Sequence, residues 1–409
     1  MQTWQNGQLS LIFYLELPIF PNGKGNAKRL ASTKHFLFIT DGVPVTSVTV
    51  HDSNFGKHGC NSKMEKRILI VRLSAIGDTI LSIPVLIALR EQFPTAKIAW
   101  VTEKASAQLL QGHSALDELF VVSKQSFKSV KELWKLRQKL QSWKPEITID
   151  LQGLTKSSLV AWLSGAKQRL GFNRDTFDGR ELSTFFNNHL YQSDSTHIVD
   201  RSIDLLALLG IKNEKVVFDL PEFDADRRFA SQSLSELGIQ GPFCIINVGA
   251  GWPSKIWPSQ RYADVANYLG KTHGLPSLIV WSGDKERLAA VEIAAKSSSC
   301  SKLAPATTLT QLRSLIRQSR MFIGSDTGPM HLAAALGVPT IGMIGPMPLQ
   351  RVSPYGEQNI GVQRDSLPAH LTSQRKSNCA PMLSIQVEDV TAACDTILNR
   401  SYQLEIKVA

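Results

Sequence analysis

The chain has 409 residues, of which 43% are hydrophobic and 20% are charged, a composition that excludes a coiled coil, a collagen-like rod and a wholly disordered chain. Its length predicts two domains. The 45 Lys and Arg residues outnumber the 35 Asp and Glu residues, so the formal net charge of +10 favours phosphates, anionic lipid surfaces or nucleic acid as partners.

Residues 1–63 differ from the rest of the chain because they show no regular hydrophobic period and contain turn-rich stretches around Gly23 and Gly56. Met64 is followed by three charged residues and then by an apolar run, which is how an α/β protein commonly starts. We therefore expect residues 1–63 to be a poorly ordered N-terminal extension, with Met64 as an alternative start.

From Met64 onward, short apolar runs alternate with longer amphipathic ones, which is typical of βα units and a parallel sheet. Strands are predicted at 68–73, 97–101, 119–122 and 147–151. Helices are predicted at 78–92, 129–143 and 198–209, the last ending at Gly210 as a C-cap. We assign residues 64–238 to the first domain.

A charged, proline-containing connector around 221–228 precedes a second set of units, assigned to residues 239–409. Its predicted strands are 243–248, 277–281, 321–324 and 340–344. Its predicted helices are 259–272, 285–296, 309–319, 329–336 and 387–398. The fold class is therefore α/β, with two doubly wound domains whose ligands lie outside the carboxyl ends of the strands.

The first domain opens with a strand, a small-residue loop and a helix, and the loop carries Gly77 and Asp78. This order places Asp78 at the predicted crevice. An aspartate at a helix start can also cap free backbone N–H groups, so the motif alone is compatible with a purely structural role.

The second domain contains a similar strand, turn and helix at 321–336. Gly328 permits a tight turn, and Pro329 fits the first helical turn because its missing N–H costs nothing there. The helix start suits a phosphate. Asp326 is itself negative, so a sugar or ribose hydroxyl is its more plausible partner; a capped helix without any ligand is the alternative.

A glycine-rich loop at 247–258 carries Gly249, Gly251 and Lys255. It is not a dinucleotide fingerprint, because Ser254 stands at the last glycine position, and the chain has no Walker-type motif. Such a loop with one lysine can hold a diphosphate by point charge. Lys255 is equally compatible with an ordinary surface lysine.

Basic residues also follow strands of the first domain. Lys156 lies in the segment 150–157, and His197 and Arg201 stand four residues apart, hence on one side of a predicted helix start. With Arg174 and Arg180 they would make the first-domain side of the crevice basic, although ordinary surface charge explains each of them singly.

Together these segments resemble the ADP-heptose:lipopolysaccharide heptosyltransferases of glycosyltransferase family 9, which are inverting enzymes of the two-Rossmann-domain GT-B architecture. The resemblance runs from about residue 66 to about 356 and looks closest to the heptosyltransferase I type. It rests on the order and spacing of the segments 74–78, 150–157, 180–181, 197–201, 255–258 and 326–332. Residues 1–63 have no family counterpart, and the polar stretch 366–377 is weakly patterned.

The resemblance implies a role for each site residue. Asp78 matches the general base and Lys255 the lysine that contacts the diphosphate. The implied donor-binding residues are Gly77, Gly249, Ser254, Glu286 at the ribose, Asp326, Thr327, Gly328 and His331. The implied acceptor-binding residues are Lys156, Arg180, His197 and Arg201.

The implied reaction moves heptose from ADP-heptose to a Kdo-containing, lipid-linked lipopolysaccharide acceptor. No Asp-x-Asp motif ends a strand of the second domain, so we expect no metal ligands and no obligatory cofactor, with Mg²⁺ at most assisting the diphosphate. The alternatives are a GT-B transferase with another sugar nucleotide or acceptor, and a non-catalytic basic protein that binds nucleic acid. No recognition motif supports the latter.

The sequence also bears on location. No apolar run reaches the roughly 18–20 residues that cross a bilayer, and the stretch 9–20 lacks the flanks of a signal peptide. The five cysteines are scattered, which is typical of free thiols in a reducing compartment. We expect a cytoplasmic protein without a nucleic-acid partner, whose lipid-linked acceptor brings it into transient contact with the inner-membrane surface.

Overall fold

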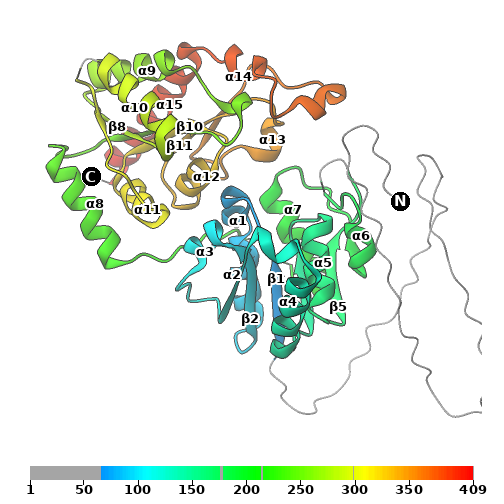
Figure 1. Cartoon of the computed structure of the whole chain (residues 1–409). Coiled ribbons are helices and arrows are strands. Elements are labelled where there is room, and N and C mark those ends of the chain that lie inside the picture. The colour runs from blue at the N-terminus through cyan, green and yellow to red at the C-terminus, as the bar shows by residue number, and fades with distance from the viewer. Residues whose placement is uncertain (1–65, 176–177, 213–214, 298, 409) are drawn as a thin grey trace, which may run out of the picture. The chain divides into compact units, whose positions relative to one another are not determined.

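The computed structural model describes residues 66–175, 178–212, 215–297 and 299–408, so the predicted extension 1–63 lies outside the described residues. Two six-stranded sheets, both entirely parallel, form the framework (Figure 1). The strands of the first sheet are β1 (Arg67–Val71), β2 (Lys97–Glu103), β3 (Glu118–Val122), β4 (Ile147–Asp150), β5 (Gln168–Phe172) and β6 (His189–Tyr191). Those of the second are β7 (Cys244–Asn247), β8 (Ser277–Val280), β9 (Ser301–Leu303), β10 (Met321–Ser325), β11 (Thr340–Met343) and β12 (Ile360–Val362).

The two sheets share one topology. Their strand orders are β3-β2-β1-β4-β5-β6 and β12-β11-β10-β7-β8-β9. In each sheet the first strand along the chain is central, the next two strands extend the sheet to one edge, and the last three extend it to the other edge. The direction reverses between β1 and β4 in the first half and between β7 and β10 in the second. Ligands of such sheets bind at that reversal, outside the carboxyl ends of the strands. The prediction of two doubly wound halves is confirmed.

Helices connect the strands in both halves. The first half contains α1 (Ile76–Leu81), α2 (Ile83–Gln92), α3 (Lys104–Leu110), α4 (Val130–Trp143), α5 (Thr155–Leu163), α6 (Ser183–Phe186) and α7 (Ile198–Asp204), with 3₁₀ turns η1 (Lys124–Phe127) and η2 (Leu205–Leu209). The second contains α8 (Asp224–Glu236), α9 (Ser259–His273), α10 (Gly283–Lys296), α11 (Leu309–Gln318), α12 (Gly328–Ala335), α13 (Leu349–Val352), α14 (Ala380–Ser384) and α15 (Val387–Val408), with η3 (Pro253–Lys255) and η4 (Ala369–Gln374). None of the helices in the described part of the chain is long and apolar enough to cross a bilayer.

The helices differ from the prediction in several places: α3, α5 and α6 were not predicted, and the helix predicted at 198–209 is α7 followed by the 3₁₀ turn η2. The helix predicted at 78–92 is two helices that divide at Ser82, because Pro84 occupies the first turn of α2 and cannot donate to a continuous helix. The last helix continues to Val408 instead of ending at 398. Helix α8, which the predicted boundary at 238/239 assigns to the first domain, packs against α11 of the second half.

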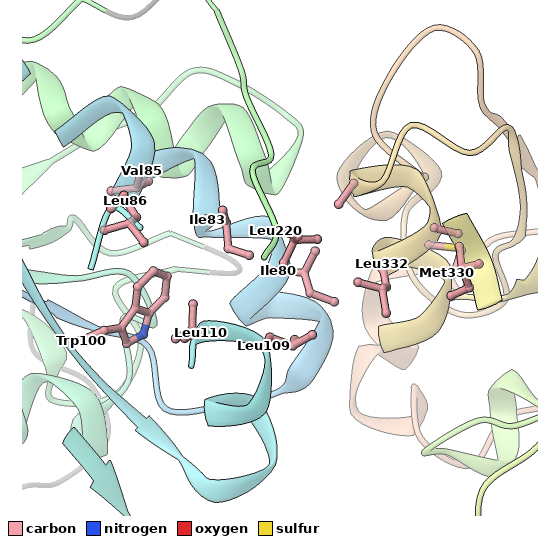
Figure 2. Packing of buried hydrophobic residues seen from close by; sticks show 14 of the residues in the cluster. Ile80, Ile83, Val85, Leu86, Trp100, Leu109, Leu110, Leu220, Met330 and Leu332 are labelled. Carbon is pink, nitrogen blue, oxygen red and sulfur yellow. The ribbon is translucent and has the colours of Figure 1, made fainter. Parts of the chain in front are cut away.

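Apolar residues cover both faces of each sheet. Ile70 of β1 packs in a cluster with α1 and α2, whereas its neighbour Val71 packs in another with α4 and α5. The cluster that contains Ile70 continues into the second half, where Leu332 of α12 belongs to it. Figure 2 shows Ile80 of α1 and Leu109 of α3 on the side of the first half nearest to Leu332. The two halves therefore share part of one apolar core.

Glycines permit the closest approach between the halves. A β-carbon on Gly77 of α1 would lie 2.9 Å from the His331 ring, and one on Gly328 of α12 would lie 2.9 Å from Cγ2 of Ile76. Carbon atoms do not approach so closely without displacement, so the absence of both side chains lets the N-terminal ends of α1 and α12 touch. Three polar contacts also join the halves: Arg351 to Asp178 at 3.0 Å, His197 Nε2 to the Ser353 carbonyl at 2.9 Å, and the Tyr355 hydroxyl to Asp200 at 2.7 Å.

We expect Gly328→Ala to lower the free energy of unfolding by about 1–3 kcal/mol, because its methyl group would press on Ile76. Urea unfolding followed by circular dichroism measures this change. Gly251→Ala is the matched control, since a β-carbon there would meet no heavy atom within 4 Å. Adding Ile76→Ala should recover part of the loss; equal stability of Gly328→Ala and the control would contradict the packing argument.

Candidate functional site

A cavity of about 860 Å³ opens between the halves at the reversal points of both sheets. The loops that follow β1, β4, β7 and β10 all contribute to its lining. The predicted site residues that line it are Gly77, Asp78, Arg180, Gly249, Lys255, Glu286, Asp326, Thr327, Gly328 and His331. The predicted residues that do not line it are Lys156, Ser254, His197 and Arg201.

Asp78 is the third residue of α1 and Ala75 is the N-cap, so Asp78 satisfies a free backbone N–H at the helix start from the N3 position of a capping box, as the sequence allowed. Its Oδ2 atom accepts a hydrogen bond from the Ala75 amide at 3.1 Å and pairs with Arg72 at 3.0 Å. Oδ1 accepts no hydrogen bond from any residue in the described ranges, and the side chain is 40% exposed. One carboxylate oxygen is therefore fixed, while the other is available to a ligand in the cavity.

Arg72 holds Asp78 in place. Its side chain is 7% exposed and its guanidinium donates to the Leu151 carbonyl just beyond β4, so Arg72 connects the ends of the two strands that flank the reversal. The segment after β4 is itself fixed by Asp150, whose buried carboxylate accepts from the amides of Gln152 and Gly153 at 3.0 and 3.1 Å. Burial raises the pKa of Asp150 despite these bonds.

On the second half, Lys255 and His331 converge on Asp326. The Lys255 ammonium donates to Asp326 Oδ2 at 2.6 Å and to its backbone carbonyl at 3.1 Å, and His331 Nε2 lies 3.2 Å from Oδ1. Burial opposes ionisation of Asp326, but the Lys255 charge and the His331 hydrogen bond outweigh it and lower the pKa of Asp326 to about 2. Asp326 therefore orients two cavity-lining side chains, and its own predicted contact with the donor stays a prediction.

The start of α12 supplies anion-binding groups beside these residues. Thr327 is the N-cap of α12, and the first-turn amides of a helix have no partner within it and lie at the positive end of the helix dipole. Lys255 has three N–H bonds, of which Asp326 uses two. The Nδ1 atom of buried His331 has no partner among the described residues. These groups can bind a phosphate and a neighbouring hydroxyl.

Glu286 of α10 lies against the glycine-rich loop. A β-carbon on Gly249 would lie 2.2 Å from its carboxylate, so only glycine allows this position. The carboxylate accepts from the Ser282 amide at 2.7 Å, and burial raises its pKa. Because Glu286 lines the cavity, its carboxylate oxygens can accept hydrogen bonds from two adjacent hydroxyls of a ribose.

Two residues that do not line the cavity stand directly behind its wall. The Lys156 ammonium pairs with Glu103 at 2.6 Å, and Glu103 lines the cavity. The Ser254 hydroxyl, fully buried, donates to the Arg375 carbonyl at 2.6 Å. This bond draws the stretch 366–377 toward the site, where Arg375 and Lys376 line the cavity.

His197 and Arg201 occupy structural positions. His197 caps α7 by accepting from the Val199 amide through Nδ1 at 3.2 Å, so Nε2 carries the proton that it donates to the Ser353 carbonyl. Burial lowers the pKa of His197. Arg201 is buried against Asp178, which also binds Arg351 across the halves. Their predicted contact with an acceptor stays untested, and the geometry gives them the role of joining the halves.

Several cavity residues were missed by sequence reasoning. Arg72 lies near the end of the strand predicted at 68–73 and directly follows the observed β1, and a charged residue at the carboxyl end of a strand is a usable signal for a site residue. Arg351, Arg375 and Lys376 follow weakly patterned segments and gave no such signal. Among the described residues, no group of three or more His, Cys, Asp or Glu side chains is placed to hold a metal ion, and the metal-free expectation stays a prediction.

Solved structures share this architecture. The crystal structure of glycosyl transferase family 9 from Veillonella parvula is 25% identical, with a TM-score of 0.69 over 83% of this chain and 99% of that one. Escherichia coli heptosyltransferase WaaC with ADP is 22% identical, with a TM-score of 0.63 over 81% and 99%. Two doubly wound halves around a shared cavity thus define the GT-B fold.

Sequence comparison gives the family. Residues 133–381 match the model described as glycosyltransferase family 9 (heptosyltransferase). Lipopolysaccharide heptosyltransferase 1 of Pseudomonas aeruginosa is 26% identical over 73% of this chain and 84% of the relative. The Escherichia coli K12 protein of the same name is 24% identical over 72% and 92%. The chain belongs to glycosyltransferase family 9, as the sequence motifs indicated.

We expect Lys255→Met to lower the free energy of unfolding by about 3–5 kcal/mol at neutral pH, because it leaves the buried Asp326 charge without its ammonium partner. Urea unfolding measures the loss. Lys255→Met combined with Asp326→Asn should be less destabilised than Lys255→Met alone. The ion pair stabilises the fold above the ordinary Asp pKa of about 3.9, and this contribution should disappear as the pH falls toward about 2. If the stability losses of Lys255→Met and Asp326→Asn simply add up in the double variant, Lys255 and Asp326 are not energetically coupled.

Proposed function

We propose that the protein transfers heptose from ADP-heptose, with inversion, to a Kdo-containing lipid-linked acceptor of the lipopolysaccharide inner core. The observation that carries this proposal is the placement of two chemistries on opposite walls of one cavity. The first half presents Asp78 with a free carboxylate oxygen, and the second presents Lys255 beside the start of α12. The names of the family relatives support heptose and lipopolysaccharide as substrates.

The second half binds the donor in this proposal. Glu286 receives the ribose hydroxyls, while Lys255 and the amides around Thr327 and Gly328 bind the diphosphate. The diphosphate gains negative charge as it leaves, so these preorganised donors stabilise the transition state more than the ground state. The similar solved structure of Escherichia coli heptosyltransferase WaaC with ADP supports a nucleoside diphosphate as the ligand.

The first half binds the acceptor and removes its proton. The acceptor hydroxyl oxygen attacks the anomeric carbon as the bond from that carbon to the diphosphate breaks, so the departing ADP keeps the electron pair. Oδ1 of Asp78 receives the hydroxyl proton. Base and leaving group occupy opposite halves, which supports attack from the opposite face and therefore inversion. Arg180 lines this wall and can pair with an anionic sugar.

The remaining features of the proposal concern cofactor and location. Charge on the leaving diphosphate is met by Lys255 and the helix start, so we propose that no metal is obligatory and that Mg²⁺ at most assists. We place the reaction in the cytoplasm, at the inner-membrane surface. A GT-B transferase with another sugar nucleotide is the alternative, because glycine loops and helix starts recognise phosphates rather than the sugar.

We expect Asp78→Asn to lower kcat by about 10²–10⁴-fold, because the amide cannot accept the proton of the acceptor hydroxyl. Steady-state transfer assays measure the change, and an unchanged affinity for ADP by calorimetry shows that the donor side is intact. Asp284→Asn, on the exposed start of α10, is the matched control and should keep its full rate. Turnover of Asp78→Asn at the wild-type rate would rule out the general-base assignment.

A thermal-shift comparison of nucleotides tests the donor. ADP-heptose and ADP should raise the melting temperature, because they bind only the folded protein. At a ligand concentration 100 times the dissociation constant, binding stabilises the folded state by about 2.7 kcal/mol. UDP, GDP and NAD should raise the melting temperature less at equal concentration. Selective stabilisation by UDP or GDP would support the alternative sugar nucleotide instead.

A further inference from the structure

Large apolar side chains are exposed on one side of the first half. Val130 and Trp134 of α4 are 79% and 58% exposed, and Leu182 and Phe185, at the start of α6, are 51% and 81% exposed. Helix α5 packs against both α4 and α6, so the three helices form one row (Figure 1), and the exposed residues belong to its two outer members. We call the exposed faces of α4, the start of α5 and α6 the α4–α6 surface.

Helix α4 combines this apolar exposure with positive charge. Leu136 and Leu140 are buried on its inner face, whereas Val130 and Trp134 lie one turn apart on the outer face. Residues 124–144 contain seven Lys or Arg and one acid, Glu132, a net charge of +6. More than half of the chain's net charge of +10 therefore belongs to this segment, much of it beside exposed Trp134.

The α4–α6 surface borders the acceptor side of the cavity. Just before α4, the Phe127 ring lies 4.3 Å below the Lys156 ammonium, and Lys156 pairs with cavity-lining Glu103. On the other side, the Leu182 amide donates to Thr155 at the start of α5, and Arg180, two residues earlier, lines the cavity. Phe127, three residues before Val130, and Leu182 thus connect the α4–α6 surface to residues that line the cavity.

We infer that the α4–α6 surface docks on an anionic lipid surface and holds the cavity rim at the headgroups. Exposed Trp and aliphatic side chains enter the interfacial region of a bilayer, while lysines beside them bind anionic headgroups. The inference rests on the proposed function, because a lipid-linked acceptor must reach the cavity from a membrane. A second copy of the same surface fits less well, since two segments of charge +6 repel each other.

The test is sedimentation of the full-length protein with vesicles of phosphatidylcholine mixed with phosphatidylglycerol, and with vesicles of phosphatidylcholine alone. The wild-type protein should bind the anionic vesicles and release them at high salt. Val130→Ser combined with Trp134→Ser should reduce the partition coefficient about tenfold or more. The matched control is Leu288→Ser with Val291→Ser, two comparably exposed apolar residues one turn apart on α10.

Charge is tested separately. Lys131→Gln and Lys135→Gln should each reduce partitioning about fivefold, since a lysine near an anionic surface contributes that factor. Lys271→Gln, exposed on α9 of the second half, should change nothing. Thermal unfolding of every variant confirms that the fold is retained.

Transfer assays connect the surface to the reaction. The Val130, Trp134 double variant should raise KM for acceptor embedded in anionic vesicles and leave KM for a delipidated acceptor unchanged. Vesicle binding equal to that of the α10 control, or absent in the wild type, overturns the inference. The inference is also overturned if the wild-type protein is a dimer and the double variant is a monomer. It is overturned likewise if the wild-type protein binds nucleic acid and the double variant does not. Failure of the proposed function would look different: no heptose transfer to either acceptor, with vesicle binding intact.

Discussion

The site depends on the contact between the positive ends of two helices. Helices α1 and α12 belong to different halves, yet their first turns touch because Gly77 and Gly328 lack side chains. Two helix N-termini at this distance repel each other through their dipoles. A carboxylate stands beside each, Asp78 in the first turn of α1 and Asp326 just before α12, and offsets that repulsion. An additional anion between the halves is therefore favoured by the fold itself.

The two carboxylates are held differently, and the difference matches their proposed roles. Asp326 is buried and both of its oxygens are engaged, so it is a fixed charge that orients Lys255 and His331. Asp78 is held through one oxygen by Arg72 and keeps the other open. The contacts of Asp178, Asp200 and the Ser353 carbonyl with residues of the opposite half keep these groups in one cavity.

The sequence predicted most of the strands because they follow from local patterns. Strands β1, β2, β3, β4, β7, β8, β10 and β11 are short apolar runs, and most are followed by turn residues. The outer strands β5, β6, β9 and β12 were missed, because strands toward the edge of a sheet need not be apolar on both faces. Asp78 and Lys255 lie in motif loops next to predicted strands, and the structure places both at the cavity, while their roles stay predictions. The partners of His197 and Arg201 are distant in sequence, so their structural role could be recognised only in three dimensions.

The Gly77–Gly328 contact also determines how the site can be blocked. Because the anion-binding groups of the second half and the Asp78 carboxylate of the first are brought within one cavity by a direct contact between the halves, a single compound can span both. A phosphate mimic joined to a hydroxylated ring by a short rigid spacer would occupy both walls simultaneously. Its second contact would form at the high effective concentration of a tethered group, and the gain would depend on spacer length rather than on the strength of either contact alone.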